Sequence, residues 1–332
     1  MSHRNDELIA GLFAQSERER RCLFTQGRSI QKALRRRIGR SVISPLPGLY
    51  TRKAHWNNLD KTKRHQEIVR ALALKHPEWT FCSFSAACLL GLEVSWKHLD
   101  VVHVCSEVKP SAKPGMYIQR HAINPSTEHI IEDVRITPPI QTVADCLIAT
   151  SFTDAMPIAD SALAKLGIEQ STLIDEIERK RRNRNNRSIA TALTTVEHAD
   201  AHAESGGESV ARAVMIETGF APDHLQLELA DPFDPDKTMR SDFAWEEMST
   251  TLTLGEFDGL AKYTDSTLLE GRTTTEKLVQ ERQRESHLSV YGHPIVRFTM
   301  REVRMPGALP NMLQIAGVRQ SPLPSWLNDI DL

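Results

Sequence analysis

The last third of the chain alternates helical and extended segments in a definite order. Apolar residues at helical spacing predict a helix from Glu208 to Gly219. Strands are expected at residues 225–229, 240–245 and 251–257, with a loop rich in Asp and Pro between the first two. A second helix and a last strand at 294–299 follow. This order predicts a domain in which helices and strands share one core.

The N-terminal segment has a different pattern. Two helical stretches with apolar stripes are separated by the turn at 25–27, and the second stripe runs to Ile38. Short extended segments at 42–43 and 49–50 follow, with Pro47 and Gly48 at the tip between them. Two helices and a β-ribbon in this order predict a winged helix-turn-helix, a fold that places one helix in the major groove of DNA.

Charge is distributed unevenly along the chain. The formal net charge is only -2, but residues 1–64 carry 15 Lys or Arg against 5 Asp or Glu, whereas residues 201–270 carry 4 against 15. A basic segment favours a polyanionic partner, and an acidic one favours carboxylates gathered around a divalent cation. A charged face that is merely solvated is the alternative in each case.

The second helix of the N-terminal segment carries the residues expected to contact DNA. Its polar positions hold side chains that read base edges or neutralise phosphates. The predicted DNA-binding residues are Arg28, Gln31, Lys32, Arg35, Arg36 and Arg52. A small helical domain with a charged surface is the alternative.

The middle of the chain shows no cluster of catalytic residue types. Helices are expected at 64–74, 142–149 and 154–166, and a small sheet between residues 99 and 140. Six Lys or Arg lie in the ten residues 178–187, which predicts a polar linker or a loop that contacts phosphates. The five cysteines are scattered and form no CxxC pair, so we expect reduced, structural thiols.

Acidic residues recur on the helix and strands of the last third. Glu208 begins the helix, Asp242 lies in the second strand, and Glu256 and Asp258 end the third strand in GEFDGLAKY. Alternate residues of a strand point the same way, so Glu256 and Asp258 should share a face. This pattern resembles the PD-(D/E)XK nuclease superfamily, in particular the branch related to very-short-patch repair endonucleases. The resemblance implies phosphodiester hydrolysis.

The resemblance also implies roles for individual residues. Asp242 and Glu256 would bind Mg²⁺ or Mn²⁺, Asp258 would add a ligand or orient water, and Glu208 would reach the site from its helix. Lys262 would balance charge on the phosphate. The chain departs from the family signature at Asp258, where the signature has Lys, so Lys262 would supply the amine from a later position. Arg212 is expected to pair with Glu208 or to contact a phosphate.

The wider sequence resembles actinobacterial proteins that join an AbiEi-type antitoxin-like half to such a nuclease-like end, over roughly residues 5–304. The expected fold class is therefore α/β multidomain. The expected divisions are a winged helix-turn-helix (1–57), an α+β middle domain (58–177), a basic linker and helix (178–203), a PD-(D/E)XK-like domain (204–304) and a C-terminal tail (305–332).

Three functions remain open at this point. The first is a Mg²⁺-dependent endonuclease that acts on duplex DNA. The second is a non-catalytic AbiEi-type regulator with a degenerate nuclease fold and a toxin or other protein as partner. An RNA-acting nuclease is a third, because phosphate contacts do not identify the nucleic acid. No apolar run is long enough for a membrane helix, so we expect a cytoplasmic protein without a membrane partner.

Overall fold

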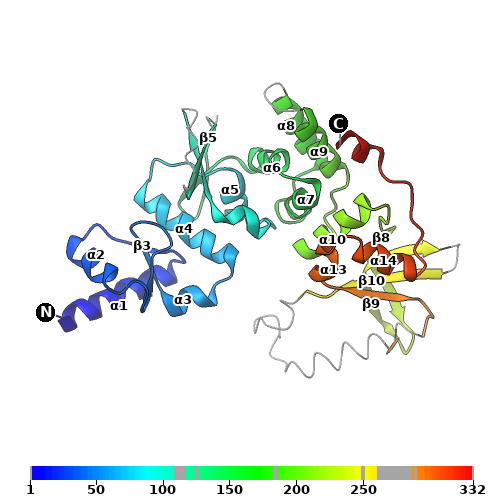
Figure 1. Cartoon of the computed structure of the whole chain (residues 1–332), viewed down its shortest axis with the longest axis horizontal. Coiled ribbons are helices and arrows are strands. Elements are labelled where there is room, and N and C mark those ends of the chain that lie inside the picture. The colour runs from blue at the N-terminus through cyan, green and yellow to red at the C-terminus, as the bar shows by residue number, and fades with distance from the viewer. Residues whose placement is uncertain are drawn as a thin grey trace. The chain divides into compact units, whose positions relative to one another are not determined.

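The computed structural model describes residues 2–107, 117–123, 127–181, 186–247, 251–259, 286–287 and 290–330. Helices and several small sheets share the chain, which confirms the predicted mixed α/β class (Figure 1). Backbone contacts divide the chain into two compact units. Unit 1 comprises residues 1–150 and 171–182, and unit 2 comprises residues 151–170 and 183–332.

Unit 1 begins with two helices and a three-stranded sheet. The sheet order is β1-β3-β2, and both pairings are antiparallel. Ile9 and Phe13 of the first helix pack with Leu34 of the second in one buried cluster, as the apolar stripes predict. The elements are α1 (Ser2–Arg18), β1 (Leu23–Phe24), α2 (Arg28–Arg35), β2 (Val42–Ile43) and β3 (Leu49–Arg52).

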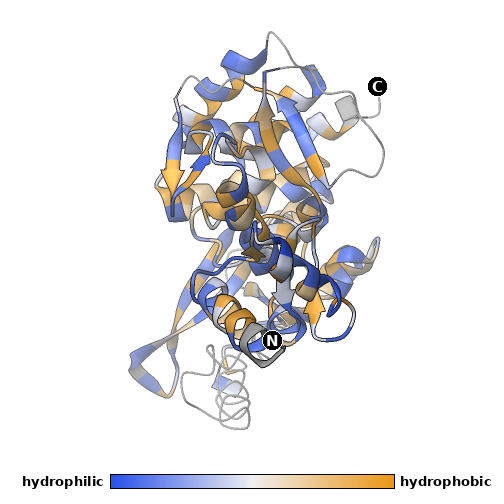
Figure 2. Cartoon of the chain, turned by 90° about the vertical axis from the view of Figure 1, so that its left-hand side faces the viewer, coloured by the Kyte–Doolittle hydropathy of each residue, from blue (hydrophilic) through white to orange (hydrophobic). Residues whose placement is uncertain are grey.

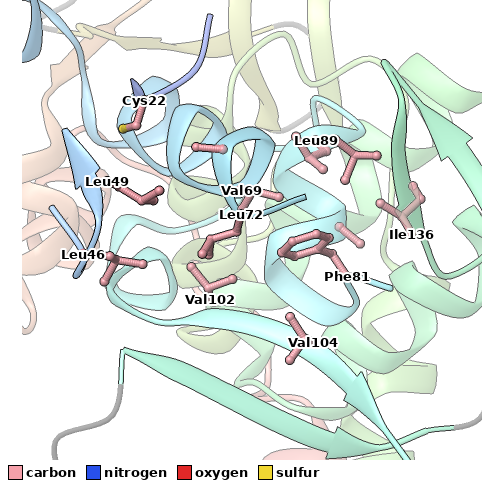
Figure 3. Packing of buried hydrophobic residues seen from close by; sticks show 13 residues of the cluster. Cys22, Leu46, Leu49, Val69, Leu72, Phe81, Leu89, Val102, Val104 and Ile136 are labelled. Carbon is pink, nitrogen blue, oxygen red and sulfur yellow. The ribbon is translucent and has the colours of Figure 1, made fainter. Parts of the chain in front are cut away.

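The rest of unit 1 surrounds a second apolar core, shown in Figure 3. Phe81 is at its centre, because its backbone bridges Val104 on one side and Ile136 on the other, so it joins two small sheets. The helices are α3 (Lys53–Asn58), α4 (Lys61–Lys75), α5 (Ser83–Leu89), the 3-10 helix η1 (Trp96–Asp100), α6 (Pro139–Ile148) and α8 (Gln170–Lys180). The strands are β4 (Val102–Ser106), β5 (Ile118–Ala122), β6 (His129–Ile131) and β7 (Val134–Ile136).

Unit 2 contains a four-stranded sheet in the order β11-β10-β9-β8. β8, β9 and β10 are antiparallel neighbours, and β11 pairs with β10 in parallel. The strands are β8 (His224–Asp231), β9 (Asp234–Glu247), β10 (Thr251–Phe257) and β11 (Ile295–Phe298). The helices are α7 (Phe152–Leu166), α9 (Asn186–Glu197), α10 (Gly206–Glu217), α13 (Met300–Arg304), α14 (Ala308–Ile315) and the 3-10 helix η3 (Ser325–Ile330).

One face of this sheet forms the main core of unit 2. Phe243, Phe257 and Phe298 come from three neighbouring strands and pack with Met215 of α10. Leu309 and Leu313 of α14 lie in the same cluster, so residues that we assigned to a tail contribute to this core. The predicted domain boundaries otherwise stay predictions.

Three local predictions were wrong. Ile38 lies beyond the end of α2 and is exposed, because the helix stops at Arg35 and a tight turn follows. Glu178 to Lys180 form the last turn of α8 and not a linker, where Glu178 pairs with Arg181. The loop predicted between the strands at 225–229 and 240–245 is shorter than expected, because β9 already begins at Asp234 after a tight turn.

Within the described ranges, no helix combines the length and the apolar character that a membrane span requires. The elements instead carry hydrophobic and hydrophilic residues in alternation, as the mixed colours in Figure 2 show. Such mixed elements bury one face and expose the other.

Candidate nucleic-acid interface and acidic site

The exposed face of α2 gathers positive charge. Residues 28, 32, 35 and 36 are separated by four, seven and eight positions, which places them along one side of a helix. The opposite side is apolar: Leu34 is completely buried, and Ile30 and Ala33 pack against the same cluster. Burial of that side fixes the orientation of α2, so its cations face outward. The exposed cations are Arg28, Lys32, Arg35 and Arg36.

The two remaining predicted DNA contacts, Gln31 and Arg52, form hydrogen bonds within the protein. The Gln31 amide donates to the Thr25 carbonyl oxygen at 2.6 Å, a bond that ties α2 to the turn before it. Arg52 forms a bidentate ion pair with Glu17 of α1, and this carboxylate raises the pKa of Arg52. Both side chains therefore stabilise unit 1 in this conformation.

Glu208 lies in the first turn of α10 and is buried. Ser205 caps the helix, accepting from the Glu208 backbone N–H at 3.2 Å and donating its hydroxyl to Glu208 Oε1 at 2.7 Å. The Glu204 backbone N–H donates to Glu208 Oε2 at 3.0 Å. This is a capping arrangement in which a carboxylate also lies at the positive end of the helix dipole.

Asp242 lies on β9 and is joined to Glu208 by Gln226 of β8. The Gln226 amide donates to Glu208 Oε2 at 3.0 Å and more weakly to Asp242 Oδ1 at 3.5 Å. The Phe257 backbone N–H of β10 donates to Asp242 Oδ2 at 2.8 Å. Glu208 and Asp242 therefore share a neighbour, and one amide bridges the two carboxylates.

Gln226 was missed by sequence reasoning. Its backbone has φ of 51°, a left-handed conformation that is uncommon for residues other than glycine. The residue lies within β8 opposite Asp242, and its carbonyl Oε1 is buried without a hydrogen-bond partner among the described residues. Strained residues often lie at functional sites. Nothing in the sequence around Gln226 predicts this conformation.

Glu256 and Asp258 lie near the end of β10, and Arg297 of β11 is opposite Glu256. Glu256 is buried in β10, next to Gly255, which pairs with Phe243 of β9. Asp258 follows the end of β10, and its carboxylate is 3.3 Å from Arg297 of β11. An ion pair of this kind leaves Asp258 balanced by the protein itself. Lys262, the expected source of an amine, lies outside the described residues.

Arg212 pairs with Asp160 of α7, a partner that we did not predict. Its guanidinium donates to Asp160 Oδ1 at 2.6 Å and to the His198 carbonyl oxygen at 2.6 Å, and both charged side chains are almost fully buried. Burial raises the pKa of Asp160, an effect that Arg212 opposes. The Asp200 backbone N–H also donates to Asp160 Oδ1, at 2.8 Å. Arg212 is thus a structural residue of unit 2.

The predicted set of three metal ligands is not assembled in the described part of the chain. Asp242, Glu256 and Asp258 have the hard oxygen atoms that Mg²⁺ prefers. However, no group of three or more His, Cys, Asp or Glu among these residues is arranged to hold a metal ion. The Asp258–Arg297 ion pair is one physical reason.

The chain was compared with known proteins by sequence and by structure. No protein-family model, no curated protein and no solved structure matches it.

Proposed function

We propose that the chain binds duplex DNA through the exposed basic face of α2. The observation that carries this proposal is the row of Arg28, Lys32, Arg35 and Arg36, none of which forms an ion pair with another described residue. Cations that the protein does not neutralise suit a polyanion, because each phosphate contact releases a counterion. The eight residues of α2 span about 12 Å, which is comparable with the width of the major groove.

Arg40 extends this surface beyond the end of α2. It is exposed, and it lies in the tight turn that leads into β2. Lys53 is exposed after β3, and its backbone N–H donates to the Ser41 carbonyl oxygen at 2.9 Å, so it lies at the same end of the β-ribbon as Arg40. Cations at this end suit further contacts to phosphates. Arg52 is a weaker candidate, because a contact with DNA would compete with Glu17.

The experiment compares two double variants of the full chain in salt-dependent binding to a fluorescent DNA duplex. Arg35→Ala with Arg36→Ala should lower the affinity about 10- to 100-fold at low salt, and should reduce the slope of log K against log salt by about 2. Arg179→Ala with Arg181→Ala removes the same charge at the C-terminal end of α8, where both residues form ion pairs, and should leave the slope unchanged. Equal effects in both variants would reject the α2 surface.

A second candidate function is Mg²⁺-dependent hydrolysis of the phosphodiester backbone. The specific observation in its favour is that Glu208 and Asp242 approach a common neighbour, Gln226, although they lie on α10 and β9. The arrangement of the other carboxylates does not match the expected ligand set.

A plasmid-nicking assay with Mn²⁺ or Mg²⁺ tests this second candidate on the same protein samples. An endonuclease should nick DNA only with metal, and Asp242→Asn should abolish nicking while DNA affinity is retained. DNA binding without metal-dependent nicking in the unmodified chain would favour a regulator. An RNA duplex of the same length, tested in parallel, would identify an RNA-binding protein if it binds more tightly than DNA.

A further inference from the structure

We propose that unit 1 contains a binding pocket for a small aromatic carboxylate, which we call the Lys75 pocket. Its volume is about 290 Å³, which is at the small end of the range for ligand pockets. Three segments form it: Leu46 and Pro47 of the β2–β3 turn, the C-terminal end of α4, and the start of β5. Ligand binding here does not depend on whether α2 contacts DNA.

The floor of the Lys75 pocket is apolar and belongs to the core. Leu46 and Leu72 are buried members of the cluster in Figure 3, where they lie close to Val102. Ile118 packs against the same cluster. A floor that is part of a packed core cannot easily collapse into the pocket. An apolar ligand would therefore replace water there at little cost to the protein.

Aromatic rings define the shape of the preferred ligand. Tyr117 is 60% exposed, although it lines an apolar pocket. The His76 ring is stacked on Trp79 with centroids 4.0 Å apart, and the Arg120 guanidinium lies over the same indole at 5.0 Å. The His76 ring, which lines the pocket, is therefore held on one face by Trp79. Flat ligands gain from such surroundings, whereas the small volume excludes long acyl chains.

Lys75 supplies the charge that selects an anion. Its ammonium group has three donors, and the nearest acceptor is the Pro47 carbonyl oxygen at 3.5 Å, a distance too long for a strong bond. The described residues that line the pocket include no Asp or Glu, and Glu78, 3.5 Å from His76, is an exposed residue outside it. A carboxylate is thus the complementary group for the remaining donors.

The test is a saturation-transfer NMR titration of the full chain with 2-naphthoate, with 2-naphthalenemethanol as the uncharged control. We expect a Kd for 2-naphthoate of about 0.1–1 mM, and weaker binding of the alcohol. Lys75→Met should weaken 2-naphthoate binding about tenfold and leave the alcohol unaffected, because only the carboxylate contacts the ammonium. Lys75→Arg, which keeps the charge, should retain most of the affinity.

Two further variants locate the ligand. Ile118→Trp should fill the pocket and abolish binding of both compounds. Lys63→Met removes one charge from the same helix, about 18 Å before Lys75 along its axis, and should change nothing. Absence of saturable binding at about 5 mM in the unmodified chain, or equal 2-naphthoate affinity in Lys75→Met and Lys63→Met, would overturn the proposal.

Discussion

The cations of α2 in unit 1 and the charged residues around Glu208 and Arg212 in unit 2 are placed in opposite ways. In unit 1 the cations of α2 point outward without an ion-pair partner among the described residues, while a buried ionisable group such as His65 is held neutral by its surroundings. In unit 2 the charges lie inside: Asp160 pairs with Arg212, and Glu208 accepts bonds from Ser205, Glu204 and Gln226.

The exposed cations of α2 can bind an external ligand, whereas the buried charges of unit 2 are already paired within the protein. A buried charge must be paired, and loss of its partner leaves an uncompensated ion in a poor solvent. An exposed cation costs almost nothing to remove from the fold. Stability measurements should therefore divide the charged residues of this chain into two groups, and the predictions below run from the largest expected effect to the smallest.

Asp160→Ala should lower the free energy of unfolding by about 3–5 kcal/mol, because the Arg212 guanidinium would remain buried without its counter-charge. Urea unfolding followed by far-UV circular dichroism measures this change. Glu178→Ala breaks an exposed ion pair and should leave the transition midpoint where it is. Equal urea midpoints for Asp160→Ala and Glu178→Ala would contradict the distinction between buried and exposed charges.

His65 makes stability depend on pH. Burial lowers the pKa of His65 from 6.5 to about 4, so between these values the unfolded chain binds a proton that the folded chain does not. The free energy of unfolding therefore falls as pH falls through this window, by up to about 3 kcal/mol for this residue. His65→Gln should lose less stability than the unmodified chain between pH 7 and about 4.5. Parallel losses would show that His65 is not responsible.

Gln226→Ala should reduce stability by about 1–3 kcal/mol, because Glu208 and Asp242 lose a shared donor. Gln226→Gly removes the same amide but adopts the left-handed backbone without strain, so it should be more stable than the alanine variant by about 1 kcal/mol. Chemical denaturation of the two variants side by side checks the order. The reverse order would mean that the backbone of residue 226 is not strained.

Arg35→Ala combined with Arg36→Ala should change the free energy of unfolding by no more than about 0.5 kcal/mol, since neither side chain packs in the core or forms an ion pair with a described residue. The melting temperature of this variant is the simplest measurement. A loss well above this value would assign these two cations to the fold of unit 1.

Periodicity predicted two elements of the last third well, whereas the second helix expected there lies largely outside the described residues. The strand at 251–257 and the helix that begins near Glu208 lie where expected, because their apolar positions pack directly into the core. Partners distant in sequence were not predictable. Arg52 pairs with Glu17 and Arg212 with Asp160, and no local pattern signals either contact. Gln226 was missed for a different reason, because a left-handed backbone at a glutamine is set by tertiary packing alone.

Gly207 gives the acidic site a mechanical property. A Cβ atom at this position would lie 2.3 Å from the Phe257 ring, so the backbone at the start of α10 packs directly on the Phe257 side chain of β10. Two elements packed this closely are expected to move together. An outward displacement of β10 would carry Ser205 and Glu208 with it, and the capping carboxylate would move in step with the strand that bonds Asp242.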